Sequence, residues 1–253
     1  MKPPPSPHPG AAPARTPTPR PHAQRKSSTT HPGQEQMALL LPDTRPSRMM
    51  LDDGALVLPG FITPEATHLL RIIEQVAAFA PFRQMATPGG GTMSAAMTGC
   101  GAAVWVTDHT GYRYTSHDPL TREPWPAMPP LLAELGEQAA QAAGFTGFTP
   151  NTALLNRYAP GSRMGLHQDR DEGECSQPVV SFSLGRSAIF QWGGARRTDP
   201  VRTVILHHGD AVVWGGPARL FFHGIKPLGH ETHPLTGDLR YNITLRYVAR
   251  TTH

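Results

Sequence analysis

Two histidines and one aspartate have the types and the spacing of an iron-binding triad. His167 and Asp169 form an H-x-D pair, and His223 follows 56 residues after the first histidine. Two imidazoles and one carboxylate can occupy one face of Fe(II) and leave the other positions open, as in non-haem oxygenases that consume O2. The alternative is that the H-x-D pair is a chance occurrence and that His223, which lies among apolar residues, is a hydrogen-bonded core residue.

Two arginines downstream could hold an anionic co-substrate. Arg240 and Arg246 are six residues apart, so on an extended strand they share one face with Asn242 and Thr244. Such a face is costly to bury unless an anion neutralises it. A planar guanidinium suits a carboxylate, so the strand predicts a dicarboxylate site. The alternative is an exposed polar face whose neighbouring residues pack on the core.

The elements that must position these residues are mostly short strands. Helical spacing of apolar residues predicts two helices, over 64–79 and 128–143, with Thr63 as the N-cap of the first. The predicted strands cover 103–107, 112–115, 152–158, 179–184, 188–192, 202–207, 210–214, 219–224 and 240–248. Many short strands at near-regular spacing favour a mainly β jelly roll of two antiparallel sheets with flanking helices, a fold that binds ligands in its mouth.

The N-terminal segment differs from the rest in composition. Residues 1–36 contain ten prolines, no aromatic residue, five Lys/Arg and one acid, a net charge of 5 − 1 = +4. The whole chain also carries +4, so residues 37–253 are neutral overall. We therefore expect a disordered basic tail over 1–47 and one domain over 48–253. Any nucleic-acid surface on that domain must be a local patch.

The sequence gives no sign of a membrane span or of a secreted, disulfide-bonded protein. No run of 18 apolar residues occurs, and Met1-Lys2 is followed by prolines instead of an apolar signal segment. The two cysteines, Cys100 and Cys175, do not form a disulfide framework. We expect a cytoplasmic protein that is a monomer.

Eight stretches, in chain order, resemble the AlkB family of Fe(II)/2-oxoglutarate-dependent alkylated-DNA repair dioxygenases. They are 81–85 (PFRQM), 87–90 (TPGG), 124–129 (PWPAMP), 156–161 (NRYAPG), 166–169 (LHQD), 210–216 (DAVVWGG), 222–225 (FHGI) and 240–246 (RYNITLR). The resemblance runs from about residue 50 to residue 250 and leaves the tail outside. It implies the double-stranded β-helix fold of the 2-oxoglutarate dioxygenases.

The resemblance also implies roles for individual residues. His167, Asp169 and His223 would bind Fe(II) as the catalytic centre. The co-substrate would be 2-oxoglutarate, with Arg240 at its far carboxylate and Arg246 near its metal-bound end. The other residues of its cradle would be Asn156, Tyr158, Asn242 and Thr244.

On the substrate side, the resemblance implies a nucleotide-recognition lid over about 80–118. Trp105 resembles the residue that stacks on the flipped base opposite His167, and Asp171 resembles the acid at the exocyclic amine of the base. Further implied contacts are Thr87, Met97, Tyr112, Arg113, Tyr114 and Arg197. The alternatives are that Trp105 is a core residue and that Arg197 belongs to an ordinary exposed cluster.

The implied reaction is oxidative demethylation of bases such as 1-methyladenine and 3-methylcytosine. It uses Fe(II), O2 and 2-oxoglutarate, and releases formaldehyde, succinate and CO2. Single- and double-stranded DNA are the expected substrates, and RNA stays open, because Trp192 and Ala195 depart from the family pattern near the nucleic-acid surface. Two other functions compete: the same core acting on a protein side chain or a small molecule, and a jelly-roll binding module without catalysis.

Overall fold

Two antiparallel sheets enclose the site in the part of the chain that the computed structural model describes, residues 45–249. The predicted tail lies outside these residues except for 45–47, and there the Arg45 guanidinium pairs with Asp210 at 2.6 Å.

The larger sheet has seven strands and the smaller has four. In spatial order the larger sheet contains β1 (Met49–Asp52), β2 (Ala55–Leu58), β11 (Ala211–Trp214), β8 (Val179–Gly185), β13 (Arg240–Arg246), β6 (Thr152–Tyr158) and β3 (Ala96–Gly101). The smaller sheet contains β10 (Arg202–Leu206), β9 (Ala188–Trp192), β12 (His223–Ile225) and β7 (Met164–His167). A separate hairpin joins β4 (Val104–Asp108) and β5 (Gly111–Thr115).

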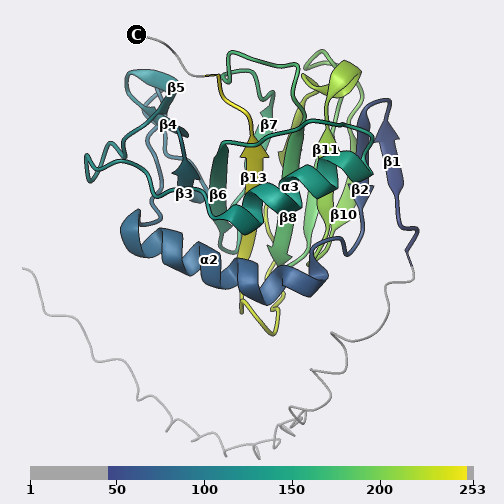
Figure 1. Ribbon diagram of the computed structural model, residues 1–253, viewed down its shortest axis with the longest axis horizontal. Coiled ribbons are helices and arrows are strands. Elements are labelled where there is room, and N and C mark those ends of the chain that lie inside the picture. Colours follow the sequence, from purple (N-terminus) through teal and green to yellow (C-terminus); the bar gives the residue numbers. More distant parts are fainter. Residues whose placement is uncertain (1–44, 250–253) are drawn as a thin grey trace, which may run out of the picture. The chain divides into compact units, whose positions relative to one another are not determined.

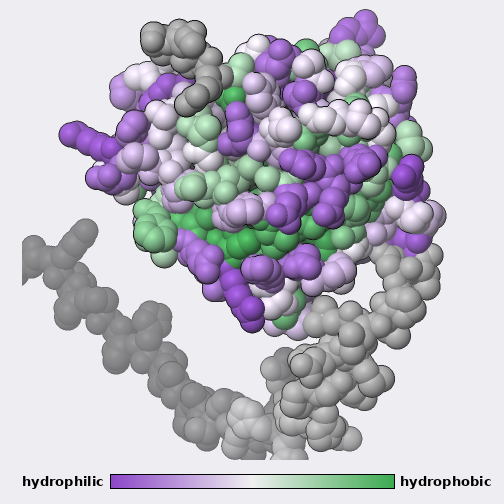
Figure 2. Space-filling view, viewed as in Figure 1, coloured by the Kyte–Doolittle hydropathy of each residue, from purple (hydrophilic) through white to green (hydrophobic). Residues whose placement is uncertain are grey.

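Two helices, α2 (Ala66–Phe79) and α3 (Pro130–Ala142), lie across one face of the larger sheet (Figure 1). Leu69, Ile73 and Val76 of α2 are buried and belong to the same apolar cluster as Leu132 of α3 and Phe182 of β8. Figure 2 shows hydrophobic residues gathered on the surface over these helices. Among the described residues, no helix is long and apolar enough to cross a membrane.

A second apolar cluster fills the space between the two sheets. Val57 and Leu154 of the larger sheet belong to it together with Phe190 and Ile225 of the smaller one. Both faces of β13 are therefore covered, one by the helices and one by the smaller sheet, and Arg240, Asn242, Thr244 and Arg246 are all buried. This overturns the alternative of an exposed polar face.

The mainly β jelly-roll prediction is confirmed, and so are both helices. The strands over 152–158 and 188–192 have the predicted bounds. The cap at Thr63 was wrong: Thr63 lies inside a 3-10 turn, η1 (Thr63–Glu65), and no side chain caps this turn or α2.

The start of the predicted strand over 219–224 was also wrong. A 3-10 turn, η2 (Gly216–Ala218), precedes this segment, and β12 begins only at His223. The sequence analysis also missed four strands, β1, β2, β3 and β7. The predicted lid range, 80–118, includes β3 of the larger sheet and the β4–β5 hairpin, which forms a separate two-stranded sheet.

Candidate metal and co-substrate site

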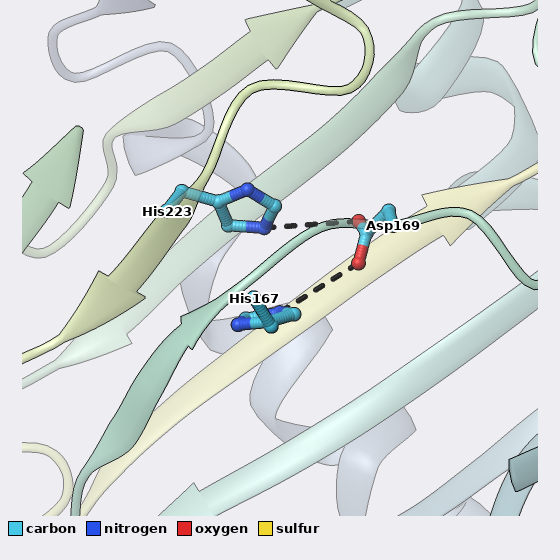
Figure 3. A group of neighbouring side chains, drawn as sticks. All are labelled: His167, Asp169 and His223. Atoms are coloured by element: carbon cyan, nitrogen blue, oxygen red, sulfur yellow. Dashed lines mark ion pairs between the residues drawn. The ribbon is translucent and has the colours of Figure 1, made fainter. Parts of the chain in front are cut away.

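The two histidines meet because their strands are neighbours in the smaller sheet. His167 is the last residue of β7, His223 is the first residue of β12, and the two are directly opposite in the ladder. Asp169 lies two residues beyond the end of β7, and its carboxylate points between the two imidazoles (Figure 3). One ligand atom from each residue lies within 4.8 Å of the other two. Sequence-distant donors thus converge on one point.

Hydrogen bonds to the backbone orient both imidazoles. His167 Nδ1 lies 2.9 Å from the Gly165 carbonyl oxygen, and His223 Nδ1 lies 3.0 Å from the Phe221 carbonyl oxygen. If each Nδ1 carries the proton of a neutral imidazole, each Nε2 presents a lone pair. These Nε2 atoms lie 3.6 Å and 3.9 Å from the carboxylate oxygens of Asp169. Burial, and then the neighbouring His167, lower the pKa of His223 to about 4, which keeps its ring neutral. The donor set fits a divalent ion.

Asp169 is held in its ionised form by its surroundings. Burial by itself would raise the pKa of this carboxyl group, but Arg246 and the two histidines outweigh burial and hold the pKa below its usual range. Arg246 donates to Asp169 Oδ2 from Nη2 at 2.8 Å and from Nε at 3.1 Å. The Oδ1 atom faces His167. The carboxylate is therefore fixed by an arginine on one side and open to a metal on the other.

A cavity of about 590 Å³ adjoins the triad, and Arg240 lines its inner end. The Arg240 side chain is buried and makes no ion pair within residues 45–249. Its hydrogen bonds go to neutral oxygens, Ser183 Oγ at 3.0 Å and the Arg186 carbonyl at 3.3 Å, and its Nε has no partner. Burial lowers the pKa of Arg240 to about 10, so the group is still charged at neutral pH. The guanidinium of Arg240 is therefore suited to bind a carboxylate group of a ligand.

Polar residues on β6 and β13 line the cavity beside Arg240. Asn156 Nδ2 donates to Asn242 Oδ1 at 3.0 Å, and Asn156 Oδ1 has no hydrogen-bond partner. Thr244 does not line the cavity; its hydroxyl donates to Asn242 Oδ1 at 2.9 Å and orients that amide. Burial raises the pKa of Tyr158, a further lining residue, to about 12, so its hydroxyl keeps its proton.

At its outer end, the cavity is lined by aromatic residues of the β4–β5 hairpin. Trp105 is half-buried and lines the cavity, and its Nε1 donates to Asp171 Oδ2 at 2.9 Å. Its ring stacks on Tyr112, with 5.5 Å between the ring centroids. Tyr114 and Met97 also line the cavity. Trp105 is therefore placed to face a ligand and is no ordinary core residue.

Two predicted substrate contacts lie away from the cavity lining. Arg113 pairs with Asp108 at 2.7 Å, which uses its charge within the hairpin. Thr87 closes a turn by donating its backbone N–H to the Gly91 carbonyl. Arg197 does line the cavity: it donates to the Leu166 carbonyl at 2.8 Å and lies over the Phe222 ring.

Two buried charged residues beside the triad were not predicted from the sequence. Arg219 donates to the Asp169 carbonyl oxygen at 2.6 Å, and Glu172 pairs with Arg246 at 3.1 Å. The only sequence signal for Glu172 was an acid-rich run after the H-x-D pair, and such runs are usually solvated. Arg219 gave no signal, because its role depends on the turn that precedes β12.

Similarity to known proteins agrees with this geometry. The 2OG-Fe(II) oxygenase superfamily matches residues 54–246. Two relatives are each described as "Alpha-ketoglutarate-dependent dioxygenase AlkB". The one from Salmonella typhimurium is 53% identical over 210 residues, which is 83% of this chain and 97% of the relative. The one from Escherichia coli is 51% identical over 211 residues, which is 83% of this chain and 98% of the relative.

A solved structure, described as "The structure of OsALKBH1", superposes with a TM-score of 0.70 at 26% identity, covering 79% of this chain and 99% of the other. The matched residues, 54–246, include every residue of the triad and both arginines of the cavity. The chain therefore belongs to the 2OG-Fe(II) oxygenase superfamily and, within it, to the AlkB family of dioxygenases.

Proposed function

We propose that this protein removes N-linked methyl groups from alkylated nucleic-acid bases by oxidation, using Fe(II), O2 and 2-oxoglutarate. The observation that carries the proposal is the layout of one cavity, which has an unpaired guanidinium at its inner end, the triad at its side and an aromatic stack at its outer end. More distant relatives have names that specify nucleic acid, "Nucleic acid dioxygenase ALKBH1" in Mus musculus and "DNA N(6)-methyladenine demethylase ALKBH1D" in Arabidopsis thaliana.

The inner end of the cavity suits 2-oxoglutarate. Arg240 would hold the far carboxylate, because its guanidinium makes no ion pair with a described residue. Asn156 and Tyr158 would add hydrogen bonds. His167, Asp169 and His223 would hold the iron. When bound, Fe(II) and 2-oxoglutarate supply the oxidation by O2 of the N-methyl carbon, which then leaves as formaldehyde.

The outer end suits a flat, cationic base. Stacking accepts any base, because each has a π face. A base methylated at N1 of adenine or N3 of cytosine is positively charged, so the Trp105 ring would add a cation–π attraction. Asp171 accepts from Trp105 with Oδ2, and its second oxygen would accept from the exocyclic amine of the base. The base must leave its stack to enter, which costs less in damaged or single-stranded nucleic acid.

The expected turnover can be measured directly. Purified protein given Fe(II), 2-oxoglutarate and an oligonucleotide carrying 1-methyladenine should release formaldehyde and succinate. Asp169→Ala should abolish both products, because the loss of one carboxylate breaks the three-ligand face. Absence of turnover in a wild-type sample that binds iron would overturn the proposal.

The breadth of the substrate range is part of the proposal. We propose action on single- and double-stranded DNA and on RNA. A panel of methylated DNA and RNA oligonucleotides, run with the full chain and with a variant lacking residues 1–44, tests this range. Turnover confined to one nucleic acid would remove the others from the proposal.

We also propose that the protein works as a cytoplasmic monomer. The support is that Cys100 and Cys175 are both free, as is usual in a reducing compartment. Sedimentation of the purified protein tests the monomer, and a fluorescent fusion tests the location.

A further inference from the structure

A buried carboxylate, Glu172, joins the β4–β5 hairpin to the metal site. Its side chain is only 1% exposed, although it lies three residues after Asp169 in a run of charged residues. Its Oε1 accepts a hydrogen bond from Tyr114 Oη at 2.9 Å and lies 3.1 Å from Arg246 Nε. Its Oε2 lies 3.3 Å from Arg219 Nη2. Both oxygens of this carboxylate thus have partners inside the protein.

The partners of Glu172 come from three separate parts of the fold. Tyr114 lies on β5 of the hairpin, Arg246 is the last residue of β13, and Arg219 follows η2. β4 packs on the larger sheet through the buried Val104 and Val106, and Glu172 adds a polar link from β5 to β13. The Tyr114 hydroxyl is the only group that β4 or β5 contributes to this cluster among the described residues.

The same two arginines fix Asp169. Arg246 donates to its carboxylate, and Arg219 donates from Nη1 to its backbone carbonyl at 2.6 Å. Arg219 Nε also donates to the Gln177 carbonyl at 2.9 Å, so this guanidinium holds the loop on both sides of Glu172. Two carboxylates and two guanidiniums balance in charge inside the protein. A change in the position of Glu172 would therefore move both arginines and, through them, the metal-ligating carboxylate.

We propose that Glu172 is a positioning residue that couples the seating of the β4–β5 hairpin to the alignment of Asp169 and Arg246. This inference rests on the proposed function, because the hairpin carries Trp105, which would contact the base. A base that holds the hairpin closed favours the Tyr114–Glu172 hydrogen bond, and that bond favours the arrangement that accepts iron and 2-oxoglutarate. By reciprocity, 2-oxoglutarate tightens the binding of the methylated strand by the same factor.

Two variants test the Tyr114–Glu172 hydrogen bond, and two others are matched controls. Tyr114→Phe removes one oxygen atom from the hairpin, and Glu172→Gln removes the charge of the acceptor. Tyr241→Phe is the control for Tyr114→Phe. It removes a hydroxyl from a half-buried tyrosine on β13 that makes no hydrogen bond to a described residue. Glu174→Gln is the control for Glu172→Gln. It removes the same charge two residues further along the loop, where the carboxylate accepts hydrogen bonds only from Ser176.

The first measurement needs no substrate. Hydrogen exchange of the β4–β5 amides in the iron-loaded protein should be about tenfold faster in Tyr114→Phe, because it loses a buried hydrogen bond to a charged group, and faster in Glu172→Gln, because the acceptor loses its charge. Both controls should exchange at the wild-type rate. Unchanged exchange in Tyr114→Phe would overturn the inference, and this variant carries the test even where Glu172→Gln fails to fold.

The second measurement tests the coupling itself. Under anaerobic conditions, with Fe(II) bound, the affinity for a 1-methyladenine oligonucleotide is measured with and without 2-oxoglutarate. The ratio of the two affinities should exceed one in the wild type and in the controls, and fall to about one in both test variants. A ratio that persists in Tyr114→Phe would overturn the coupling. A wild type that does not demethylate would instead contradict the proposed function, and the exchange rates would still decide the role of Glu172.

Discussion

The two arginines of β13 have different electrostatic surroundings, although one strand face carries both. Arg246 meets two carboxylates, Asp169 and Glu172, and burial is outweighed there so that the pKa of Arg246 lies above its usual range. Arg240 donates hydrogen bonds only to neutral oxygens, and burial lowers its pKa to about 10 against the opposing effects of Tyr158 and Asp210. A buried charge without a partner costs free energy. Arg246 therefore stabilises the fold, whereas Arg240 is a buried charge that a bound anion would stabilise.

This difference predicts opposite effects of the same substitution. Arg240→Met should leave the melting temperature of the ligand-free protein unchanged or higher, because it removes an unpaired buried charge. It should abolish the rise in melting temperature that 2-oxoglutarate causes in the Mn(II)-loaded wild type. Arg246→Met should destabilise the ligand-free protein by about 3–5 kcal/mol, because it leaves the buried Asp169 carboxylate without an ion-pair partner and leaves Glu172 with Arg219 alone.

Differential scanning calorimetry with and without 2-oxoglutarate measures both variants. A normal response of Arg240→Met to 2-oxoglutarate would show that the far carboxylate binds elsewhere.

At the residue scale, the sequence predicted the groups whose chemistry shows in their type. Residue type and spacing made the triad and both arginines candidates, but a chance H-x-D pair and an exposed polar face stayed open until the resemblance to the AlkB family favoured the metal and co-substrate roles. Glu172 and Arg219 were missed because their importance comes from burial, which a charged loop sequence does not indicate. The ion pair of Arg113 with Asp108 was also not predicted, and the nucleic-acid contact of Arg113 stays a prediction.

At the element scale, the metal site depends on how closely β12 approaches β7. Gly224 follows His223, and a Cβ added at Gly224 would lie 2.7 Å from the Met164 carbonyl oxygen. The ladder also shifts its register between His223 and Ile225. The sequence predicted a longer strand over 219–224 because the run Leu220–His223 is apolar, but the preceding 3-10 turn delays the strand until His223. Tertiary packing overrode the local pattern.

Gly224→Ala is therefore expected to weaken iron binding without unfolding the protein. The added methyl group must push β12 away from β7, which separates His223 from His167 and opens the three-ligand face. We expect Fe(II) affinity to fall by at least tenfold, while the far-ultraviolet circular dichroism spectrum stays that of the wild type. Isothermal titration under anaerobic conditions measures the affinity.

Gly89→Ala is the matched control, because a Cβ there meets nothing within 4 Å. Equal iron affinity in the two variants would mean that the β7–β12 spacing does not set the geometry of the triad.

At the scale of the folded unit, the pairing of distant strands could not be predicted from the sequence. The spacing of short strands predicted two antiparallel sheets, which the fold confirms. It gave no register, because β7 and β12 lie far apart in the chain and meet through contacts that no local pattern specifies. Strands β1 and β2 form a hairpin across Asp53 and Gly54, a local turn signal that was not used, and β2 pairs on its other side with β11, more than 150 residues away.

Acid should destabilise the whole fold through a histidine far from the metal. His208 Nδ1 accepts the Gly185 backbone N–H at 2.9 Å, and its ring stacks on His233 with 4.6 Å between centroids. Burial, and then His233, lower the pKa of His208 from 6.5 to about 4, against an opposing effect of Asp210. Between these two pH values the unfolded chain binds more protons than the folded protein, so stability falls as the pH drops through this window.

His208→Asn separates this effect from the other titrating groups. The amide oxygen of asparagine can accept the Gly185 N–H and does not titrate, so the turn after β8 keeps its hydrogen bond. Urea unfolding at pH 7.5 and pH 5 should show a smaller acid-induced loss of stability in His208→Asn than in the wild type. The remaining loss in the variant belongs to other buried groups such as His223. If both proteins lose the same free energy of unfolding, the His208 ring accepts its proton in the folded state as readily as in the unfolded chain.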